Sequence, residues 1–309
     1  MPLLSDLTRQ VKEQLGRRLP KQLTQQDNNV ETWLTYLSQP NPWLKDLDIL
    51  ANKAAFLEIT QVIVRVIQHE EESLLTQDLP SWLCSVLRYW HNNRSHVITL
   101  NYDTIVERAA SQVIEANGDH VKLYNIYPQV IATIRSRKGG LVLDNRLESF
   151  QLHKLHGSTN WYYSGVDNFH GEILYYSDVA PWGSDRSWET QSRRMAADKE
   201  ALIVPPSFAK APYFQHETIR YIWNEAGEAL RNANRIFVIG YSMPESDLGF
   251  RYFFNHFRPV TSCSMYVADV SSKVATRYKA FARRRFRVNT EFVGQNAVHK
   301  LVDYLDSGS

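Results

Sequence analysis

Polar side chains and a glycine stand directly after short apolar segments in this sequence, where they could form a binding site. These residues are Asn101, Asp103, His156, Gly240, Tyr241, Ser242 and Asp269. The segments at 96–100, 235–239 and 265–268 are rich in β-branched or large apolar residues, which predicts buried strands. In an open parallel sheet, ligands bind beyond the carboxyl ends of the strands. The sequence therefore predicts that most of these residues line one edge of a sheet.

The residue types suggest which chemistry this edge would support. A histidine titrates near neutrality and can accept a proton at working pH, which makes His156 a candidate base. Gly157 follows it, and a glycine permits the close approach of a ligand to the backbone. An acidic residue at the end of a strand, as Asp269 is, can bind ribose hydroxyls in dinucleotide-binding folds.

Each candidate also has a purely structural interpretation. Asn101 or Asp103 could cap the helix that follows them, and Asp269 could cap the next helix along the chain. His156 could be a hydrogen-bonded core histidine, and Gly240 could be an ordinary turn glycine. Their shared position on one predicted edge favours the binding site.

The pattern of apolar residues predicts the elements that position these side chains. Helical spacing dominates residues 3–95, which predicts a mainly helical lobe over residues 1–95. Strand–loop–helix units follow, and these are the building blocks of a parallel sheet. We therefore expect an α/β protein, with a Rossmann-like parallel sheet covered by helices on both faces over residues 96–309. Residues 117–200 are less regular, and we interpret them as an insertion packed on the sheet.

These patterns also give approximate bounds for the elements. The expected helices span 30–37, 51–67, 80–90, 104–116, 247–257, 272–281 and a C-terminal segment to 305, and the expected last strand spans 288–293.

Composition excludes several classes of function. The 309-residue chain carries 35 basic and 33 acidic residues, a balance that gives no direct indication of a nucleic-acid partner. Its two cysteines, Cys84 and Cys263, are too few for a zinc ribbon, and we expect no metal. No apolar run approaches 18 residues and no secretory signal is visible, so we expect a cytoplasmic protein without a membrane span. Motifs for P-loop, zinc-protease and α/β-hydrolase chemistry are missing.

Three segments, in this order, resemble motifs of the sirtuins. T-L-N-Y-D at 99–103 resembles the sirtuin T-Q-N-I-D, and L-H-G at 155–157 resembles the segment that holds the catalytic histidine. G-Y-S at 240–242 stands where sirtuins have G-T-S. The resemblance covers roughly residues 1–300 and implies a sirtuin-type NAD-binding domain.

Longer segments resemble a bacterial branch of this family. K-L-H-G-S-T-N-W at 154–161, V-P-P at 204–206 and G-Y-S-M-P-E-S-D at 240–247 are similar to segments of bacterial sirtuin-like proteins. Many of those proteins are NAD hydrolases of anti-phage defence. The resemblance therefore implies an enzyme that consumes NAD and releases nicotinamide with ADP-ribose or cyclic ADP-ribose. It also implies control by homo-oligomerisation or by a regulatory partner subunit.

The resemblance assigns a role to each candidate. Asn101 would position the ribose and the attacking water, and His156 would be the general base or the partner of a ribose hydroxyl. Asp103 would contact the nicotinamide amide, and Asp269 would meet the adenosine ribose. Gly240, with Tyr241 and Ser242, would line the path of the phosphates and adenosine. Cleavage of the nicotinamide–ribose bond would pass through an oxocarbenium-like transition state, as other glycosidic cleavages do. The leaving group is already cationic, so the site needs no strong acid to expel it.

The sequence departs from the sirtuin pattern at three places. Leu100 replaces the glutamine of T-Q-N-I-D, which removes one polar ribose contact. Without a zinc ribbon, protein deacylation is the less favoured activity. The glycine-rich G-A-G-x-S loop that holds the pyrophosphate in sirtuins is missing, and we expect that upstream residues were lost rather than naturally absent. The alternative function is a weak or inactive sirtuin-like module that binds a nucleotide or a partner.

Overall fold

The computed structural model describes most of the chain. The described residues are 4–20, 23, 25, 28–115, 126–128, 132–133, 149–164, 175–176, 179, 182–183, 199–204, 216–244, 247–282 and 286–307. Much of the expected insertion at 117–200 lies outside them, as do Pro205 and Pro206 of the V-P-P segment and Glu245 and Ser246.

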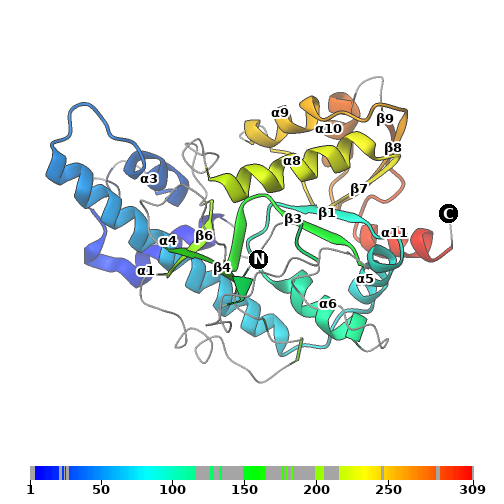
Figure 1. Cartoon of the computed structure of the whole chain (residues 1–309), viewed down its shortest axis with the longest axis horizontal. Coiled ribbons are helices and arrows are strands. Elements are labelled where there is room, and N and C mark those ends of the chain that lie inside the picture. The colour runs from blue at the N-terminus through cyan, green and yellow to red at the C-terminus, as the bar shows by residue number, and fades with distance from the viewer. Residues whose placement is uncertain are drawn as a thin grey trace.

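The N-terminal part of the chain is helical, as predicted (Figure 1). It consists of α1 (Leu4–Leu15), the short 3-10 helix η1 (Gly16–Arg18), α3 (Val30–Leu37), α4 (Asp46–Leu75) and α5 (Ser81–Asn92). The side chain of Asn29 caps α3 by accepting a hydrogen bond of 2.9 Å from the backbone of Glu31. Helices α1, α3 and α4 enclose one apolar core, whose largest buried side chain is Trp33. Tyr102, which follows the first strand, packs against this core.

The later part of the chain alternates strands and helices around a parallel sheet, which confirms the α/β prediction. The strands are β7 (Arg235–Ile239), β8 (Cys263–Ala268) and β9 (Phe286–Asn289), in the order β7-β8-β9. The helices are α8 (Glu217–Asn232), α9 (Leu248–His256), α10 (Ser272–Ala282) and α11 (Ala297–Asp306). Figure 1 shows α8, α9 and α10 on one side of these strands and α5 and α11 on the other.

Alternating side chains of β7 and β8 enter two different apolar clusters. Ile236 and Val238 pack into the cluster that includes α8, α9 and α10. Phe237 and Ile239 instead pack into the cluster that includes α5 and α11. Because successive side chains of a strand point to opposite faces, each face of the sheet is covered by its own set of helices.

A second parallel pair carries the first candidate residues. It is formed by β1 (His96–Thr99) and β3 (Gln151–Lys154), and α6 (Ile105–Glu115) follows β1. Helix α8 packs on both strands. Residues 151–154 therefore belong to a parallel strand pair, although the sequence interpretation placed them within the insertion.

A mixed sheet follows in the order β2-β5-β4-β6. Its strands are β2 (Ala132–Thr133), β4 (Gly157–Ser164), β5 (Tyr175–Tyr176) and β6 (Lys199–Ile203). Gly157 begins β4 with φ +79°, and a Cβ atom on it would lie 2.0 Å from the carbonyl oxygen of Leu202. At the position where a Cβ atom would stand, the close approach that this glycine allows is made by the backbone of β6.

The predicted last strand is displaced in the structure. It was expected at 288–293, whereas β9 spans Phe286–Asn289. The side chain of Asn289 accepts a hydrogen bond of 2.9 Å from the backbone of Glu291, and this turn ends the strand. Val293 then forms a single parallel bridge with Asp269. Among the helices of the described residues, none combines the length and apolar character that crossing a bilayer requires.

Candidate functional site

The register of β1 and β3 brings Asn101 and His156 to the same edge. Thr99 pairs with Lys154, and the backbone of Leu155 donates a hydrogen bond of 3.0 Å to the carbonyl of Thr99. Asn101 and His156 each stand two residues beyond a paired residue, Thr99 or Lys154. Because the strands are parallel, both residues follow the carboxyl ends of neighbouring strands.

The two side chains differ in their surroundings. Asn101 is exposed, and its backbone donates to the hydroxyl of Thr99 at 3.1 Å. His156 is only 6% exposed. Its ring lies 6.1 Å from the ring of Tyr102, at an interplanar angle of 29°, and 6.3 Å from that of Trp223. The imidazole is therefore held in one orientation between two aromatic rings, one of them from α8.

The ring of Trp223, on α8, contacts His156. The indole of Trp223 donates a hydrogen bond of 2.8 Å to the carbonyl of Leu155, which anchors the turn that carries His156. Trp161 is instead buried edge-on against Tyr127, with ring centroids 5.1 Å apart. No local sequence pattern indicates this contact, because it depends on how α8 crosses β1 and β3.

Asp103 is buried behind Asn101. One carboxylate oxygen accepts a hydrogen bond of 3.2 Å from the backbone of Ile105, so this side chain does cap α6. Within the described part of the chain, its other oxygen, Oδ2, receives no hydrogen bond. Burial raises the pKa of Asp103, and nearby Glu107 raises it further, while Lys154 lowers it. The carboxyl thus has one oxygen committed to the helix and one that is buried without a hydrogen bond from the described residues.

A buried ion pair lies beneath this edge, and the sequence gave no indication of it. The ammonium group of Lys154 lies 2.8 Å from the carboxylate of Glu107 and also donates to the backbone carbonyl of Asp103. The hydroxyl of Tyr127 donates to the same Glu107 oxygen at 2.9 Å. These contacts join β3, α6 and the loop after β1.

A second buried carboxylate comes from the helical lobe. Glu71 of α4 accepts hydrogen bonds from the backbone and the hydroxyl of Thr104, at 2.9 and 2.7 Å. The Nε atom of Arg108 lies 3.6 Å from the same oxygen, Oε2, that accepts from the Thr104 hydroxyl. Burial raises the pKa of Glu71 to about 7, with a further contribution from Asp103. Burial thus raises the pKa of Glu71 by more than nearby Arg108 lowers it. The two hydrogen bonds with Thr104 attach the loop between β1 and α6 to the helical lobe.

Gly240 and Asp269 form a second pair at the carboxyl edge of the sheet. Ile239 pairs with Ala268 in the parallel β7–β8 pair, and the backbone of Gly240 donates a hydrogen bond of 3.0 Å to the carbonyl of Ala268. Gly240 has φ +64° and open space where a Cβ atom would stand. Asp269 accepts a hydrogen bond of 2.7 Å from the backbone of Ser271, as expected for a residue that precedes a helix.

The loop after Gly240 is held from α10. Tyr278 donates to the carbonyl of Tyr241 at 3.1 Å, and Arg277 donates to the carbonyl of Ser242 at 2.5 Å. The hydroxyl of Tyr241 donates to the carboxylate of Asp247 at 2.8 Å. The predicted residues Tyr241 and Ser242 therefore contribute to the structure of the loop through both side-chain and backbone groups.

A row of aromatic contacts connects the two pairs of candidate residues. Trp223, which touches His156, lies edge-on to Phe253 at 4.9 Å, and Phe253 contacts Phe250 at 5.7 Å. Phe250 in turn lies edge-on to Tyr241 at 5.0 Å. His156 and Tyr241 are thus connected through the packed side chains of α8 and α9.

Comparison with known proteins assigns this chain to no family. No protein-family model matches the sequence, and no curated protein matches it. The resemblance to sirtuins stays a prediction that depends on the quoted motifs. Among the described residues, no group of three or more His, Cys, Asp or Glu side chains is placed to hold a metal ion.

Proposed function

We propose that this chain cleaves the nicotinamide–ribose bond of NAD, as the sirtuin-like motifs imply, with Asn101 and His156 as its catalytic residues. The observation that supports this proposal is the register of β1 and β3, in which Thr99 pairs with Lys154. It gives the amide and the imidazole equivalent positions after neighbouring strands. Gly240 and Asp269, which follow β7 and β8 of the separate three-stranded sheet, offer a second pair of positions for the adenosine half of NAD.

The proposed reaction needs few groups from the protein. The bond between the ribose carbon and the nicotinamide nitrogen breaks, and its electron pair neutralises the pyridinium ring. The oxygen of a water molecule, positioned by Asn101, bonds to the ribose carbon, and one water proton passes to His156. The products are nicotinamide and ADP-ribose. Attack by the adenine ring in place of water would give the cyclic product.

Asp103 completes the proposed site. Its Oδ2 atom is buried and receives no hydrogen bond from the described residues, so it is able to accept one from the nicotinamide amide. The side chain reaches this position because its other oxygen is held at the start of α6. Removing such a buried acceptor from water is unfavourable unless a donor is supplied, and the substrate would supply it.

The burial of His156 favours the alternative function, a nucleotide-binding or partner-binding module with weak or no turnover. The side chain is packed between Tyr102 and Trp223 and is 6% exposed. A general base must come within hydrogen-bond reach of the water that it activates. If the imidazole stays in this position when NAD is bound, the site would hold a ligand without cleaving it.

Release of nicotinamide from NAD by the purified protein distinguishes the two functions. We expect release by the natural sequence and its loss, by at least 100-fold, in both Asn101→Ala and His156→Ala. Matched controls are Asn92→Ala and His299→Ala, which change exposed residues at the end of α5 and on α11. Because His156 is buried, His156→Gln and a thermal melt of each variant separate loss of chemistry from loss of folding. Tight NAD binding without release would support the binding module instead.

A further inference from the structure

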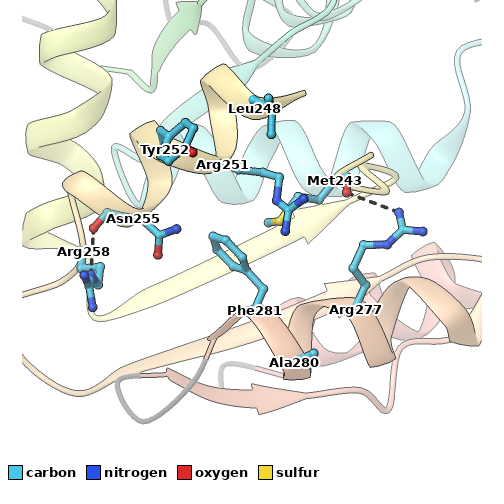
Figure 2. A pocket seen from close by; sticks show the side chains of 9 residues that line it. All are labelled: Met243, Leu248, Arg251, Tyr252, Asn255, Arg258, Arg277, Ala280 and Phe281. Atoms are coloured by element: carbon cyan, nitrogen blue, oxygen red, sulfur yellow. Dashed lines mark hydrogen bonds between the residues drawn. The ribbon is translucent and has the colours of Figure 1, made fainter. Parts of the chain in front are cut away.

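A cavity of about 690 Å³ lies between α9 and α10, and none of the predicted site residues lines it. Figure 2 shows the side chains that surround it. They are Met243, Leu248, Arg251, Tyr252, Asn255, Arg258, Arg277, Ala280 and Phe281. A volume of this size is typical of sites that bind small molecules or cofactors.

Three guanidinium groups give the cavity its charge. Arg251 lies on α9, Arg258 follows the end of α9, and Arg277 lies on α10. Among the described residues, no acidic side chain lines the cavity. Within the described part of the chain, none of the three arginines forms an ion pair with a carboxylate. Three cations that line one cavity without a carboxylate partner are favourable for an anion, and guanidinium groups bind phosphate with two hydrogen bonds at once.

The same arginines keep donors available for a ligand. Arg258 donates to the carbonyl of Asn255 at 2.8 Å, and Arg277 donates to the carbonyls of Ser242 and Met243. A guanidinium group has five N–H donors, so each retains several. Arg251 lies over the ring of Phe281, 6.0 Å from its centroid, which holds its charged group at the cavity wall.

Aromatic and amide groups complement the arginines. Tyr252 lines the cavity, and 72% of its surface is exposed to solvent, so its ring is accessible to a ligand. Phe281 offers a second ring, and Asn255 offers an exposed amide. Rings stack on nucleobases, and amides form hydrogen bonds with the edges of bases.

The cavity extends away from the proposed NAD site. Met243 belongs to the loop at the carboxyl edge of the sheet, whereas Arg258 follows the last residue of α9. Because a crossover helix runs opposite to the strands it connects, Arg258 stands near the amino edge of the sheet. The cavity therefore follows the outer surface of α9 and α10. A ligand in it would not occupy the edge that carries Asn101 and His156.

We propose that this cavity is a second site, which binds a nucleotide with its phosphates on Arg251, Arg258 and Arg277 and its base against Tyr252 and Phe281. The proposal does not depend on NAD cleavage. It has a structural consequence, because Arg277 also holds the carbonyls of Ser242 and Met243. A phosphate on Arg277 would therefore act on the loop that follows β7.

Calorimetric titration with ADP tests the second site. We expect ADP to bind, and adenosine and pyrophosphate to bind at least tenfold more weakly, because each lacks one half of the contacts. Arg251→Gln and Arg258→Gln should each weaken ADP binding about tenfold, the effect of losing a charge-assisted hydrogen bond. Arg220→Gln, which changes an exposed arginine of α8, should leave binding unchanged.

The Asp269→Ala variant separates this cavity from the proposed NAD site, which could also take the adenosine half of ADP. ADP binding that survives in Asp269→Ala and is weakened by Arg258→Gln supports the second site. Binding lost in Asp269→Ala but retained in both arginine variants would overturn it. Absence of ADP binding would overturn it too, and pyrophosphate binding as tightly as ADP would overturn the contact with the base.

Discussion

Lys154 and Glu107 form an ion pair of 2.8 Å in which each side chain is only 1% exposed. The pair lies beneath the loop that carries Asn101 and Asp103, because Lys154 also donates to the carbonyl of Asp103. A buried ion pair is stable only while both charges are present. If one side chain is removed, the desolvation cost of the remaining charge is no longer compensated. The position of the candidate site therefore depends on a pair that does not take part in the proposed chemistry.

We predict that breaking this pair destabilises the fold much more than removing it. Lys154→Met should lower the free energy of unfolding by about 3–5 kcal/mol, because Glu107 is left buried without its partner. The double variant Lys154→Met with Glu107→Leu should recover a large part of that loss. Urea unfolding of the two single variants and the double variant measures the coupling.

An exposed ion pair provides the control for this cycle. Arg9 lies 3.3 Å from Glu13 on α1, and both side chains are largely exposed. Arg9→Met should change the free energy of unfolding by less than about 1 kcal/mol. Additive effects of the two buried substitutions would show that Lys154 and Glu107 do not depend on each other.

Glu71 should make stability fall as pH rises through the range near neutrality. Burial raises its pKa from 4.5 to about 7, so between these values the folded protein keeps a proton that the unfolded chain has released. The free energy of unfolding then decreases with rising pH, by up to about 3 kcal/mol from this group. Glu71→Gln should remove this contribution, because the amide does not ionise.

The comparison between Glu71→Gln and the natural sequence is the proper measure, because other buried groups titrate in the same range. His153 acts in the opposite direction, since burial lowers its pKa to about 3 and the unfolded chain binds the proton more tightly. Denaturant unfolding at pH 5, 6, 7 and 8 should therefore show a difference between the two proteins that grows with pH and then levels off. A difference that does not vary with pH would contradict the assignment to Glu71.

Gly157 should tolerate no side chain. Alanine would have to adopt φ +79° and would place its Cβ atom 2.0 Å from the carbonyl of Leu202. We expect Gly157→Ala to reduce the free energy of unfolding by about 3 kcal/mol or more, from backbone strain together with overpacking. Thermal unfolding measures this loss.

Gly240→Ala is the matched control, because this glycine shares the positive φ but has open space around the Cβ position. Its cost should be limited to backbone strain, about 1–2 kcal/mol. Equal losses in the two variants would mean that contact with β6 contributes nothing at Gly157.

Asp103→Asn should reduce nicotinamide release without weakening the fold. The amide oxygen can still accept from Ile105, while the amide nitrogen replaces Oδ2 and presents a donor where the proposed substrate contact needs an acceptor. We expect release to fall at least tenfold and the free energy of unfolding to change by less than about 1 kcal/mol, because burial already disfavours the charged carboxylate. Thr276→Val, on the exposed face of α10, should leave release unchanged. Full activity in Asp103→Asn would remove Asp103 from the site.

The sequence predicted the fold where local patterns dominate. The segment 235–239 is a strand with the bounds that its apolar run indicated, and 30–37 is a helix with the predicted bounds. The helix predicted at 51–67 extends over Asp46–Leu75, because polar residues beyond Ile67 are buried by partners distant in sequence. Gln68, for example, donates to the carbonyl of Thr159 at 3.3 Å.

The site was less accessible to sequence reasoning than the fold. Polar residues after apolar runs identified Asn101 and His156, and the register of the strands sets them at one edge. Nothing in the spacing indicated that Glu71, Glu107 and Lys154 would be buried around them, because charged residues are usually at the surface. Such burial depends on pairing between distant segments, which has no local signature.

The face of the sheet covered by α5 and α11 has a consequence for how the chain folds. Val86, from before the first strand, and Leu301, from the last helix, belong to the same apolar cluster. During synthesis this apolar side of α5 stays uncovered until α11 has left the ribosome. Closing such a long loop is slow, and the uncovered surface is prone to aggregate meanwhile. We therefore expect the chain to need chaperone protection until α11 has emerged.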